Sequence, residues 1–262
     1  MSRIIIFIDF DRIQGNKSLD YVQFESSLEN IFDKISSVIS SNDVALTFNY
    51  KHYKLNTTTG IASKGIYDGM IHGGIMYILA SVYNKIKYEH GLSKDITPVL
   101  SRTLVDARNL NEKNGKTISK FLAKPLDILE KSAISSLLYE GYMPVTLING
   151  GIPVLQKLQY YQEFTGEIDA CAASSLLAVL VEADTLLIVT SYRCISIIEN
   201  NKLVDIQKIR YDDMKKYFYN NNFKNADMKN KVYTSLDFLE KGGKYVYINS
   251  ANNIMNGTYI HA

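Results

Sequence analysis

Short apolar runs that alternate with segments of helical periodicity constrain this chain more than any other feature. The runs expected to be strands are IIIFID, DVALTFN, ITPVLSRTLVDA, MPVTLI, TLLIVT, KYVYINS and GTYIHA. Between the first two, apolar residues recur every three or four positions from Tyr21 to Ile39, which predicts an amphipathic helix. Alternating strands and helices predict an α/β fold, a three-layer α/β/α sandwich with a mostly parallel central sheet.

Glycine and proline positions suggest where further elements begin and end. The stretch IYDGMIHGGIMYILASVYNKI is expected to be a glycine-rich loop that enters a buried helix. A second helix, PLDILEKSAISSLLYEG, is expected to begin at Pro125 and end at Gly141. It leads into the strand MPVTLI and a turn at NGGIP.

The last third of the chain carries clear signals for a helix, a hairpin and another helix. We expect a helix from Ala172 to Leu180 and a hairpin that turns at Asn200 and Asn201. A final helix is predicted over Ala226 to Lys241, closed by two glycines. Since no internal repeat or linker interrupts the pattern, residues 1–262 are expected to form a single domain.

Charge and cysteine content exclude several classes of protein. The 29 basic and 27 acidic residues are dispersed along the chain, so no nucleic-acid partner is expected. Cys171 and Cys194 have no companions at ligand spacing, which argues against a disulfide framework or a zinc site and favours a cytoplasmic location. Glu182 and Asp184 interrupt the best apolar run, so no membrane segment is expected, and the run at the start is too short for a signal peptide.

Two carboxylates follow the first strand. Asp9 and Asp11 are two positions apart, and alternation along a strand would place both side chains on one side. Such a pair could hold a metal ion, as in phosphatases of the haloacid dehalogenase type and in some nucleases. Alternatively, a solvated loop begins at Asp9.

Several motifs, in order along nearly the whole chain, carry a family resemblance. They are HGGIMYILASVYN, LVDA, NGGIPV, GEIDACAASSLLAVLVEADTLLIVT, NADMKNKV and the closing GTYIHA. In this order they resemble the carbamate kinases, members of the amino acid kinase family. The resemblance implies the fold of that family, a homodimer, and phosphoryl transfer between ATP, with Mg²⁺, and a carbamate or carboxylate oxygen. Such a reaction needs fixed cations and backbone N–H groups around the phosphates.

The resemblance also implies site residues. The nucleotide side would be Gly150, Gly151, Thr190, Met228 and Lys231, and the substrate side would be Thr47, His72 and Gly73. Of the family's catalytic residues, Lys231 and Asp169 would be remnants. No metal ligand is assigned.

This chain departs from the family where the phosphates would lie. Asp9 to Arg12 replaces a Gly-Gly-Asn-Ala sequence, and Thr47 to Tyr53 replaces a glycine-containing loop. Ala170 and Cys171 stand at the family's catalytic lysine and aspartate, and Ser191 stands at a nucleotide-side aspartate. A protruding lid should be shortened over residues 107–125.

These losses predict a carbamate kinase-like protein whose phosphotransfer is impaired or lost, and which acts as a binding or interaction protein with an unknown ligand or protein partner. An active kinase that uses carbamoyl phosphate or a related small acid is the alternative, and a metal-dependent hydrolase is a third. The retained Lys231 is compatible with a residual pocket for ATP or ADP.

Single residues keep alternative interpretations. Lys231 either contacts a nucleotide phosphate or is an exposed lysine at a helix start. His72 either lies near the substrate or is a cap or a satisfied core group. Cys171 is a small buried side chain rather than a thiolate. Asp9 and Asp11 are expected to face solvent, so that changing both to Asn should leave the melting temperature unchanged or slightly raised.

Overall fold

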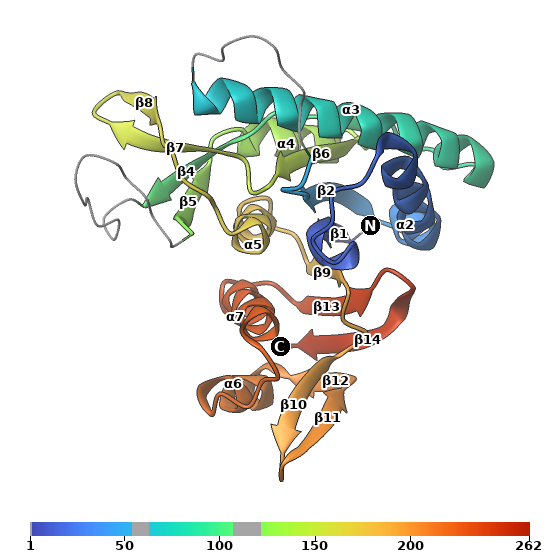
Figure 1. Cartoon of the computed structure of the whole chain (residues 1–262), viewed down its shortest axis with the longest axis vertical. Helices are drawn as coiled ribbons and strands as arrows, with labels where there is room; N and C mark the ends of the chain where they lie inside the picture. Colours follow the sequence, from blue (N-terminus) through green and yellow to red (C-terminus); the bar gives the residue numbers. More distant parts are fainter. Residues whose placement is uncertain (1, 54–62, 107–121) are drawn as a thin grey trace.

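The central feature of the fold is an eight-stranded sheet. The structure is a computed structural model that describes residues 2–53, 63–106 and 122–262 (Figure 1). The strands of this sheet are, in spatial order, β12 (Lys208–Arg210), β14 (Asn253–His261), β13 (Tyr245–Ser250), β9 (Thr185–Thr190), β1 (Arg3–Asp9), β2 (Asp43–Asn49), β6 (Met143–Ile148) and β3 (Ile96–Pro98). All neighbours are parallel except β13 and β14.

Helices cover both faces of this sheet. The helices are α1 (Phe10–Ile13), α2 (Tyr21–Ser41), α3 (Lys64–His90), α4 (Lys131–Tyr139), α5 (Ala170–Leu180), α6 (Tyr211–Tyr219) and α7 (Ala226–Glu240). Alternate residues of β1 enter two separate cores: Ile4, Ile6 and Ile8 pack with α2 and α3, whereas Ile5 and Phe7 pack with α5. Figure 1 shows α5 and α7 on one side of the strands and α2 on the other. The predicted three-layer α/β/α sandwich is confirmed.

A second sheet projects from the first. It has the order β5 (Lys124–Ile128), β4 (Arg102–Asp106), β7 (Ile152–Lys157) and β8 (Tyr160–Glu163), and lies at the upper left of Figure 1. The predicted shortening of a lid falls mostly on residues 107–121, which lie outside the described residues. A separate hairpin of β10 (Ile195–Glu199) and β11 (Lys202–Ile206) has the predicted turn at Asn200 and Asn201.

Two sequence predictions in the middle of the chain were wrong. The single strand predicted over ITPVLSRTLVDA is two strands, β3 and β4, which belong to different sheets. The helix expected at Pro125 begins at Lys131 instead, because Pro125 pairs with Val105 in β5. Since β5 is an edge strand, the missing N–H of proline is tolerated there.

The glycine-rich stretch expected to be a loop is instead the first half of α3. Ser63 caps the helix by accepting a hydrogen bond from the backbone N–H of Ile66. Its glycines allow other segments to come close: a Cβ at Gly65 would lie 3.1 Å from Glu163, and one at Gly74 would lie 3.1 Å from the Tyr53 hydroxyl. Local propensity, which disfavours glycine in helices, was outweighed by these close contacts.

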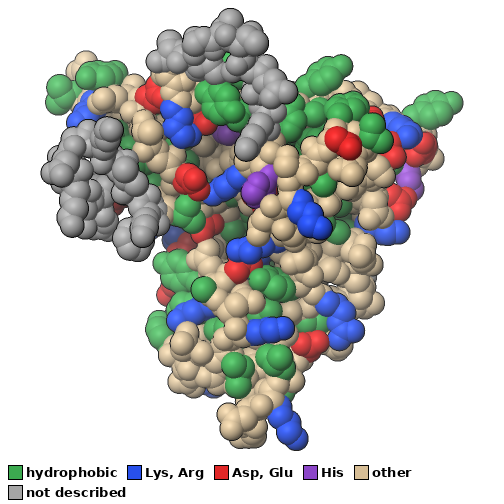
Figure 2. Space-filling model, in the orientation of Figure 1, with side chains coloured by type: hydrophobic (Ala, Val, Ile, Leu, Met, Phe, Trp, Pro, Cys, Tyr) green, Lys and Arg blue, Asp and Glu red, His purple; other side chains and the backbone are tan. Residues whose placement is uncertain are grey.

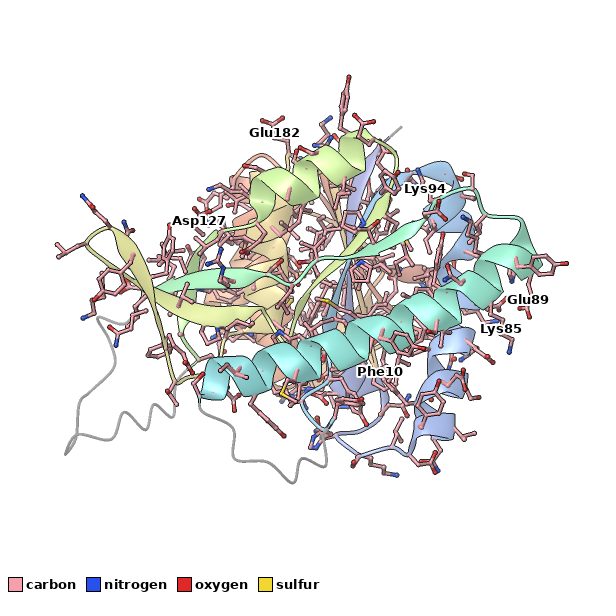
Figure 3. All side chains as sticks on the ribbon, turned by 90° about the horizontal axis from the view of Figure 1, so that it is seen from above. Phe10, Lys85, Glu89, Lys94, Asp127 and Glu182 are labelled. Atoms are coloured by element: carbon pink, nitrogen blue, oxygen red, sulfur yellow. The ribbon has the colours of Figure 1, made fainter. Side chains whose placement is uncertain are left out.

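Helix α3 extends from the four-stranded sheet to α2. Its first half lies beside the four-stranded sheet, and its second half, which carries Lys85 and Glu89, lies beside α2 (Figure 3). None of the described helices combines the length and the apolar character needed to cross a bilayer.

The parallel arrangement places several strand ends along one edge of the sheet. Asp9 ends β1 and Asn49 ends β2, and these two residues are register partners. The same edge receives the end of β6 at Ile148. In open α/β sheets, ligands bind beyond the carboxyl ends of the strands, so this edge is where a site is expected.

Candidate functional site

A polar cavity of about 220 Å³ lies beyond the ends of β1 and β2. We call it the Lys231 cavity, because Lys231 and the four aspartates Asp9, Asp11, Asp169 and Asp227 line it. Arg12 and Lys51 add two further cations. On the face in Figure 2, acidic and basic side chains lie close together near the middle of the molecule.

Lys231 is held by two carboxylates. Its Nζ lies 2.6 Å from Asp9 Oδ2 and 3.1 Å from Asp227 Oδ2, and the Lys231 and Asp9 side chains are only 4% and 5% exposed. Burial alone would lower the pKa of Lys231, but the charges of Asp9 and Asp227 outweigh it and raise this pKa above its ordinary value. Lys231 is therefore a buried cation and not the exposed lysine of one interpretation.

Asp227 joins this pair to a second cation. Its Oδ1 lies 3.2 Å from Arg12 Nη2. Burial acts to raise the pKa of Asp227, but Lys231 and Arg12 together lower it below the ordinary value for a carboxyl group. The four side chains form one chain of alternating charge, Arg12, Asp227, Lys231 and Asp9.

Asp9 and Asp11 are both buried, which contradicts the prediction that they face solvent. The ring of Phe10 between them anchors the turn, since it packs 5.0 Å from the rings of Phe24 and Tyr50 (Phe10 is labelled in Figure 3). Asp9 Oδ1 accepts a hydrogen bond of 3.0 Å from Asn49 Nδ2. The strand alternation predicted for the two carboxylates is wrong, because Asp11 lies in α1, but both carboxylates line the Lys231 cavity.

Asp11 differs from Asp9 because it has no cation as a direct partner among the described residues. Its two oxygens accept the backbone N–H of Lys51 at 3.2 and 3.1 Å. Burial raises the pKa of Asp11, and the hydrogen bond from Lys51 offsets this only in part. Asp11 therefore adds a further carboxyl group to the cavity, and burial disfavours its ionised form.

Asp169, the other predicted catalytic remnant, has a structural role that accounts for its oxygens. It caps α5 by accepting the backbone N–H of Ala172 at 3.0 Å, and Asn230 donates to its second oxygen. Cys171 beside it is buried, as expected, and burial raises the pKa of its thiol. Both residues line the Lys231 cavity.

The residues of this cavity do not fit the triphosphate of ATP. Lys231 already has two carboxylate partners, and Asp9 lies where the resemblance expects a glycine backbone. A phosphate oxygen about 5 Å from one of these carboxylates would be repelled by roughly 3 kcal/mol at an effective dielectric constant near 20. In addition, no group of three or more His, Cys, Asp or Glu among the described residues could hold a metal ion.

We expect Mg²⁺ and Mn²⁺ to leave the thermal stability of the protein unchanged. If the protein bound one of these metals, a concentration of about 100 times the dissociation constant would raise the free energy of unfolding by roughly 2.7 kcal/mol. The measurement is differential scanning fluorimetry with each metal and with EDTA. A metal-dependent rise of several degrees that disappears in the Asp9→Asn, Asp11→Asn protein would establish a metal site and favour the hydrolase alternative.

A second cavity of about 220 Å³ adjoins the first, and Lys51 and Ile168 line both. We call it the His72 cavity. It lies between α3, the end of β2 and the turn after β6. His72 is only 3% exposed, and burial and then the charge of Lys64 lower its pKa to about 4. Its Nδ1 has no hydrogen-bond partner among the described residues, so within that part of the chain His72 is not the satisfied core group of one interpretation.

The other residues predicted for a nucleotide do not gather around Lys231. Gly150 and Gly151 form the turn between β6 and β7, where both have a φ of +89°, and Gly151 lines the His72 cavity instead. Thr190 lines a different cavity, together with Ser191. Met228 is buried, and its sulfur accepts the backbone N–H of Ser196 at 3.2 Å.

Two of the three predicted substrate residues lie away from both cavities. Thr47 is inside the sheet, where its hydroxyl donates to the Ile6 carbonyl at 3.4 Å. Gly73 is exposed on α3, and apart from its own helix no described residue lies within 4 Å of the position that a Cβ would take. Only His72 lines a cavity.

Sequence reasoning missed most partners of the charged residues. Asp227 lies one helical turn before Lys231, a spacing that could have suggested their pairing. Asn49 ends β2, and Arg12 and Lys51 come shortly after the ends of β1 and β2, so their place at this edge of the sheet could also have been predicted. Glu167 could not have been found in this way, because only the fold brings it to Lys51.

Comparisons with known proteins agree with this architecture. Residues 75–250 match the profile of the amino acid kinase family. A carbamate kinase of Thermoplasma acidophilum is 28% identical, covering 98% of this chain and 96% of the relative, and one of Thermoplasma volcanium is 29% identical over 70% of each chain.

A solved carbamate kinase from Giardia lamblia, bound to AMP-PNP, has the same fold. It superposes with a TM-score of 0.88 at 19% identity, covering 99% of this chain and 98% of the other. The family profile spans more than half of the chain, and the relatives named above that match nearly the whole chain are carbamate kinases. This carbamate kinase-like chain belongs to the amino acid kinase family.

Proposed function

We propose that this protein does not transfer phosphate between ATP and carbamate, and that it acts as a binding protein. The observation that carries the proposal is the 2.6 Å contact between Lys231 Nζ and Asp9 Oδ2 inside a buried, carboxylate-rich cavity. Transfer of a phosphoryl group requires cations that are free to stabilise charge on the phosphate oxygens. Here the retained lysine is neutralised by the protein itself.

The losses seen in the sequence support the same proposal. Ala170 and Cys171 replace the lysine and aspartate that the resemblance implies, and both are buried at the start of α5. Loss of one preorganised donor typically lowers kcat by about 10²–10³. Because several such groups are absent together, the chemical step would be slowed beyond measurement.

The expected result of a direct assay is no carbamoyl phosphate from ATP, Mg²⁺ and carbamate. The assay couples product formation to a sensitive readout at high protein concentration, and a carbamate kinase assayed in parallel serves as the positive control. The Ala170→Lys, Cys171→Asp protein should also be inactive, because Lys231 is still paired with Asp9. Turnover near one per second by the unaltered protein would support the active-kinase alternative.

A nucleotide titration shows whether the protein has lost nucleotide binding or only phosphoryl transfer. If a residual pocket for ADP persists, Lys231→Ala should weaken calorimetric binding by roughly 1–2 kcal/mol, the scale of one charge-assisted hydrogen bond. Because Lys231 is already paired with Asp9 and Asp227, we expect the unaltered protein not to bind the nucleotide.

The homodimer implied by the resemblance is part of the same proposal, and light scattering during size exclusion tests it.

A further inference from the structure

The strands β13, β14 and β12, at one end of the central sheet, carry exposed aromatic and basic side chains on one face. Helices α6 and α7 lie on the other side of these strands (Figure 1), and Val246 and Ile260 enter the core there. Leu187, which pairs with Tyr247 across β9 and β13, belongs to the core on the side of α2. The exposed side chains therefore continue the face of the sheet that α2 covers farther along.

The strand register arranges these side chains in two rows. Residues two positions apart on a strand point to the same face. The rows that cross β12, β14 and β13 are Lys208, Tyr259 and Tyr247, and Arg210, His261 and Tyr245. We call these six residues the tyrosine face. Tyr245 and Tyr247 are 41% and 37% exposed, and the two cations are also exposed.

The rings of this face pack against one another. The Tyr259 ring stacks on Tyr247, with centroids 4.8 Å apart, and on His261, with centroids 5.4 Å apart. Lys208 Nζ lies 5.8 Å from the centroid of the same ring. Single-stranded nucleic acids bind by stacking bases on open ring faces. Because the faces of Tyr259 are already in contact with neighbours, this surface favours a partner that pairs with cations and accepts hydrogen bonds from tyrosine hydroxyls.

The charge of the tyrosine face has one sign, since it contains a lysine and an arginine and no carboxylate. Arg210 Nε lies 3.6 Å from Asp213, but Lys216 Nζ binds the same carboxylate at 2.8 Å. The Arg210 side chain is 67% exposed, so its contact with Asp213 is weak and can exchange for a contact with a partner. A second copy bound through the same face would bring like charges together. Charge complementarity therefore favours an acidic partner.

We propose that the tyrosine face docks an extended acidic segment of another protein. Lys208 and Arg210 are two positions apart on β12, about 7 Å, which matches the spacing of alternate carboxylates in an extended segment. These cations bind two such carboxylates, and the hydroxyls of Tyr245 and Tyr247 donate hydrogen bonds to the same segment. The inference goes beyond the proposed function and does not depend on it, since none of the six residues lines the Lys231 cavity.

Protection of a sheet edge accounts for only part of this surface. β12 is the last strand of the sheet, and lysine on an edge strand commonly prevents unwanted pairing with other strands. That role requires the cations of β12 alone. It does not explain the exposed tyrosines of β13, which is the third strand from the edge. Tyrosine and arginine are enriched in protein–protein interfaces, as expected for a docking surface.

Matched probes test the class of partner by fluorescence anisotropy at low salt. The acidic probe is a labelled peptide with blocked ends and the sequence Glu-Thr-Glu-Thr-Glu, and its neutral counterpart has Gln in place of Glu. A thymidine tetranucleotide carries as many phosphates as the peptide carries carboxylates. The acidic peptide should bind at least about tenfold more tightly than the neutral one, and more tightly than the tetranucleotide. Its affinity should fall as salt is added, because ions screen exposed charges.

Variants test the surface. The Lys208→Gln, Arg210→Gln protein should bind the acidic peptide about tenfold more weakly or worse. The matched control is the Arg102→Gln, Lys131→Gln protein, which loses the same two kinds of charge at exposed positions beside the four-stranded sheet and should keep its affinity. Tyr247→Phe keeps the ring and removes the hydroxyl, so it should weaken binding by about threefold or more. All of these side chains are at least partly exposed, so the variants should fold.

Several outcomes would overturn the inference. They include no binding of the acidic peptide, equal binding of its neutral counterpart, and equal affinities for the Lys208→Gln, Arg210→Gln protein and its control. Tighter binding of the tetranucleotide would assign the face to nucleic acid instead. A smaller mass of the Lys208→Gln, Arg210→Gln protein in light scattering would assign it to self-association. Formation of carbamoyl phosphate would reject the proposed function without affecting this inference.

Discussion

Replacing Lys231 with methionine is expected to lower the free energy of unfolding by about 3–5 kcal/mol, the usual cost of leaving one partner of a buried ion pair alone. The substitution removes the contact of 2.6 Å with Asp9, whose carboxylate would then keep only the hydrogen bond from Asn49. Asp9→Leu should also destabilise the protein, but less, because Asp227 still pairs with Lys231. Chemical denaturation at neutral pH measures each change.

The double variant Asp9→Leu, Lys231→Met tests whether the cost comes from unpaired charge. Replacing both members of a buried pair by apolar residues is often neutral, so the double variant should be more stable than Lys231→Met alone. Lys241→Met is the control, because the pair of Lys241 with Asp237 is exposed and should contribute at most about 1 kcal/mol. Equal losses in Lys231→Met and Lys241→Met would contradict a structural role for the Lys231–Asp9 pair.

This result would also correct the stability prediction made from sequence for Asp9. Neutralising Asp9 and Asp11 was expected to leave the melting temperature unchanged or to raise it slightly. For Asp11 that direction remains the prediction, because burial raises its pKa and its folded, ionised form is unfavourable at neutral pH. For Asp9 the buried contact with Lys231 reverses the expected sign.

Most of the central sheet could be predicted because most of its strands carry a local signal, although β12 was not predicted and β3 was merged with β4. IIIFID and TLLIVT are mostly apolar, as strands buried on both faces usually are, and they pair as β1 and β9. Ala226 to Lys241 was predicted almost to the residue, since a cap and two glycines mark its ends. Local signals of this kind need no knowledge of distant segments.

Prediction failed where distant segments decide the structure. Pro125 reads as a helix start, but pairing with β4 makes it part of an edge strand. Gly74 lies in a stretch expected to be a loop that enters a helix, but it allows Tyr53 to approach α3 closely. In both cases tertiary contacts outweighed local preference.

The charges of the site show the same limit. The sequence places Asp9 and Asp11 at a strand end, and both line one cavity. It contains no sign that Lys231, more than 200 positions later, neutralises Asp9, because the pairing depends on where the fold places α7 relative to the end of β1. The same reasoning applies to Lys51 and Glu167, which belong to distant segments and meet where the two cavities adjoin.

His72 should make the stability of the protein fall steeply as the pH decreases from neutrality. Burial, with the charge of Lys64, lowers the pKa of His72 from 6.5 to about 4. A histidine with a depressed folded-state pKa contributes stability that is fully present above the unfolded pKa and is lost as the pH falls toward the folded pKa. Between about pH 7.5 and about pH 4.5, this group alone should lower the free energy of unfolding by about 2–3 kcal/mol.

The comparison that isolates this group is the change in unfolding free energy between those two pH values, measured by chemical denaturation for the unaltered protein and for His72→Leu. The variant should lose less stability over this interval by about 2–3 kcal/mol, whatever its stability at neutral pH. His90→Asn is the comparison variant, because it removes a histidine that pairs with Asp33 at the exposed end of α3 and so measures what a surface histidine contributes. Equal pH dependence in the unaltered protein and His72→Leu would mean that the imidazole accepts a proton as readily in the folded state as in the unfolded one. In that case the His72 imidazole would be accessible to water in the folded protein.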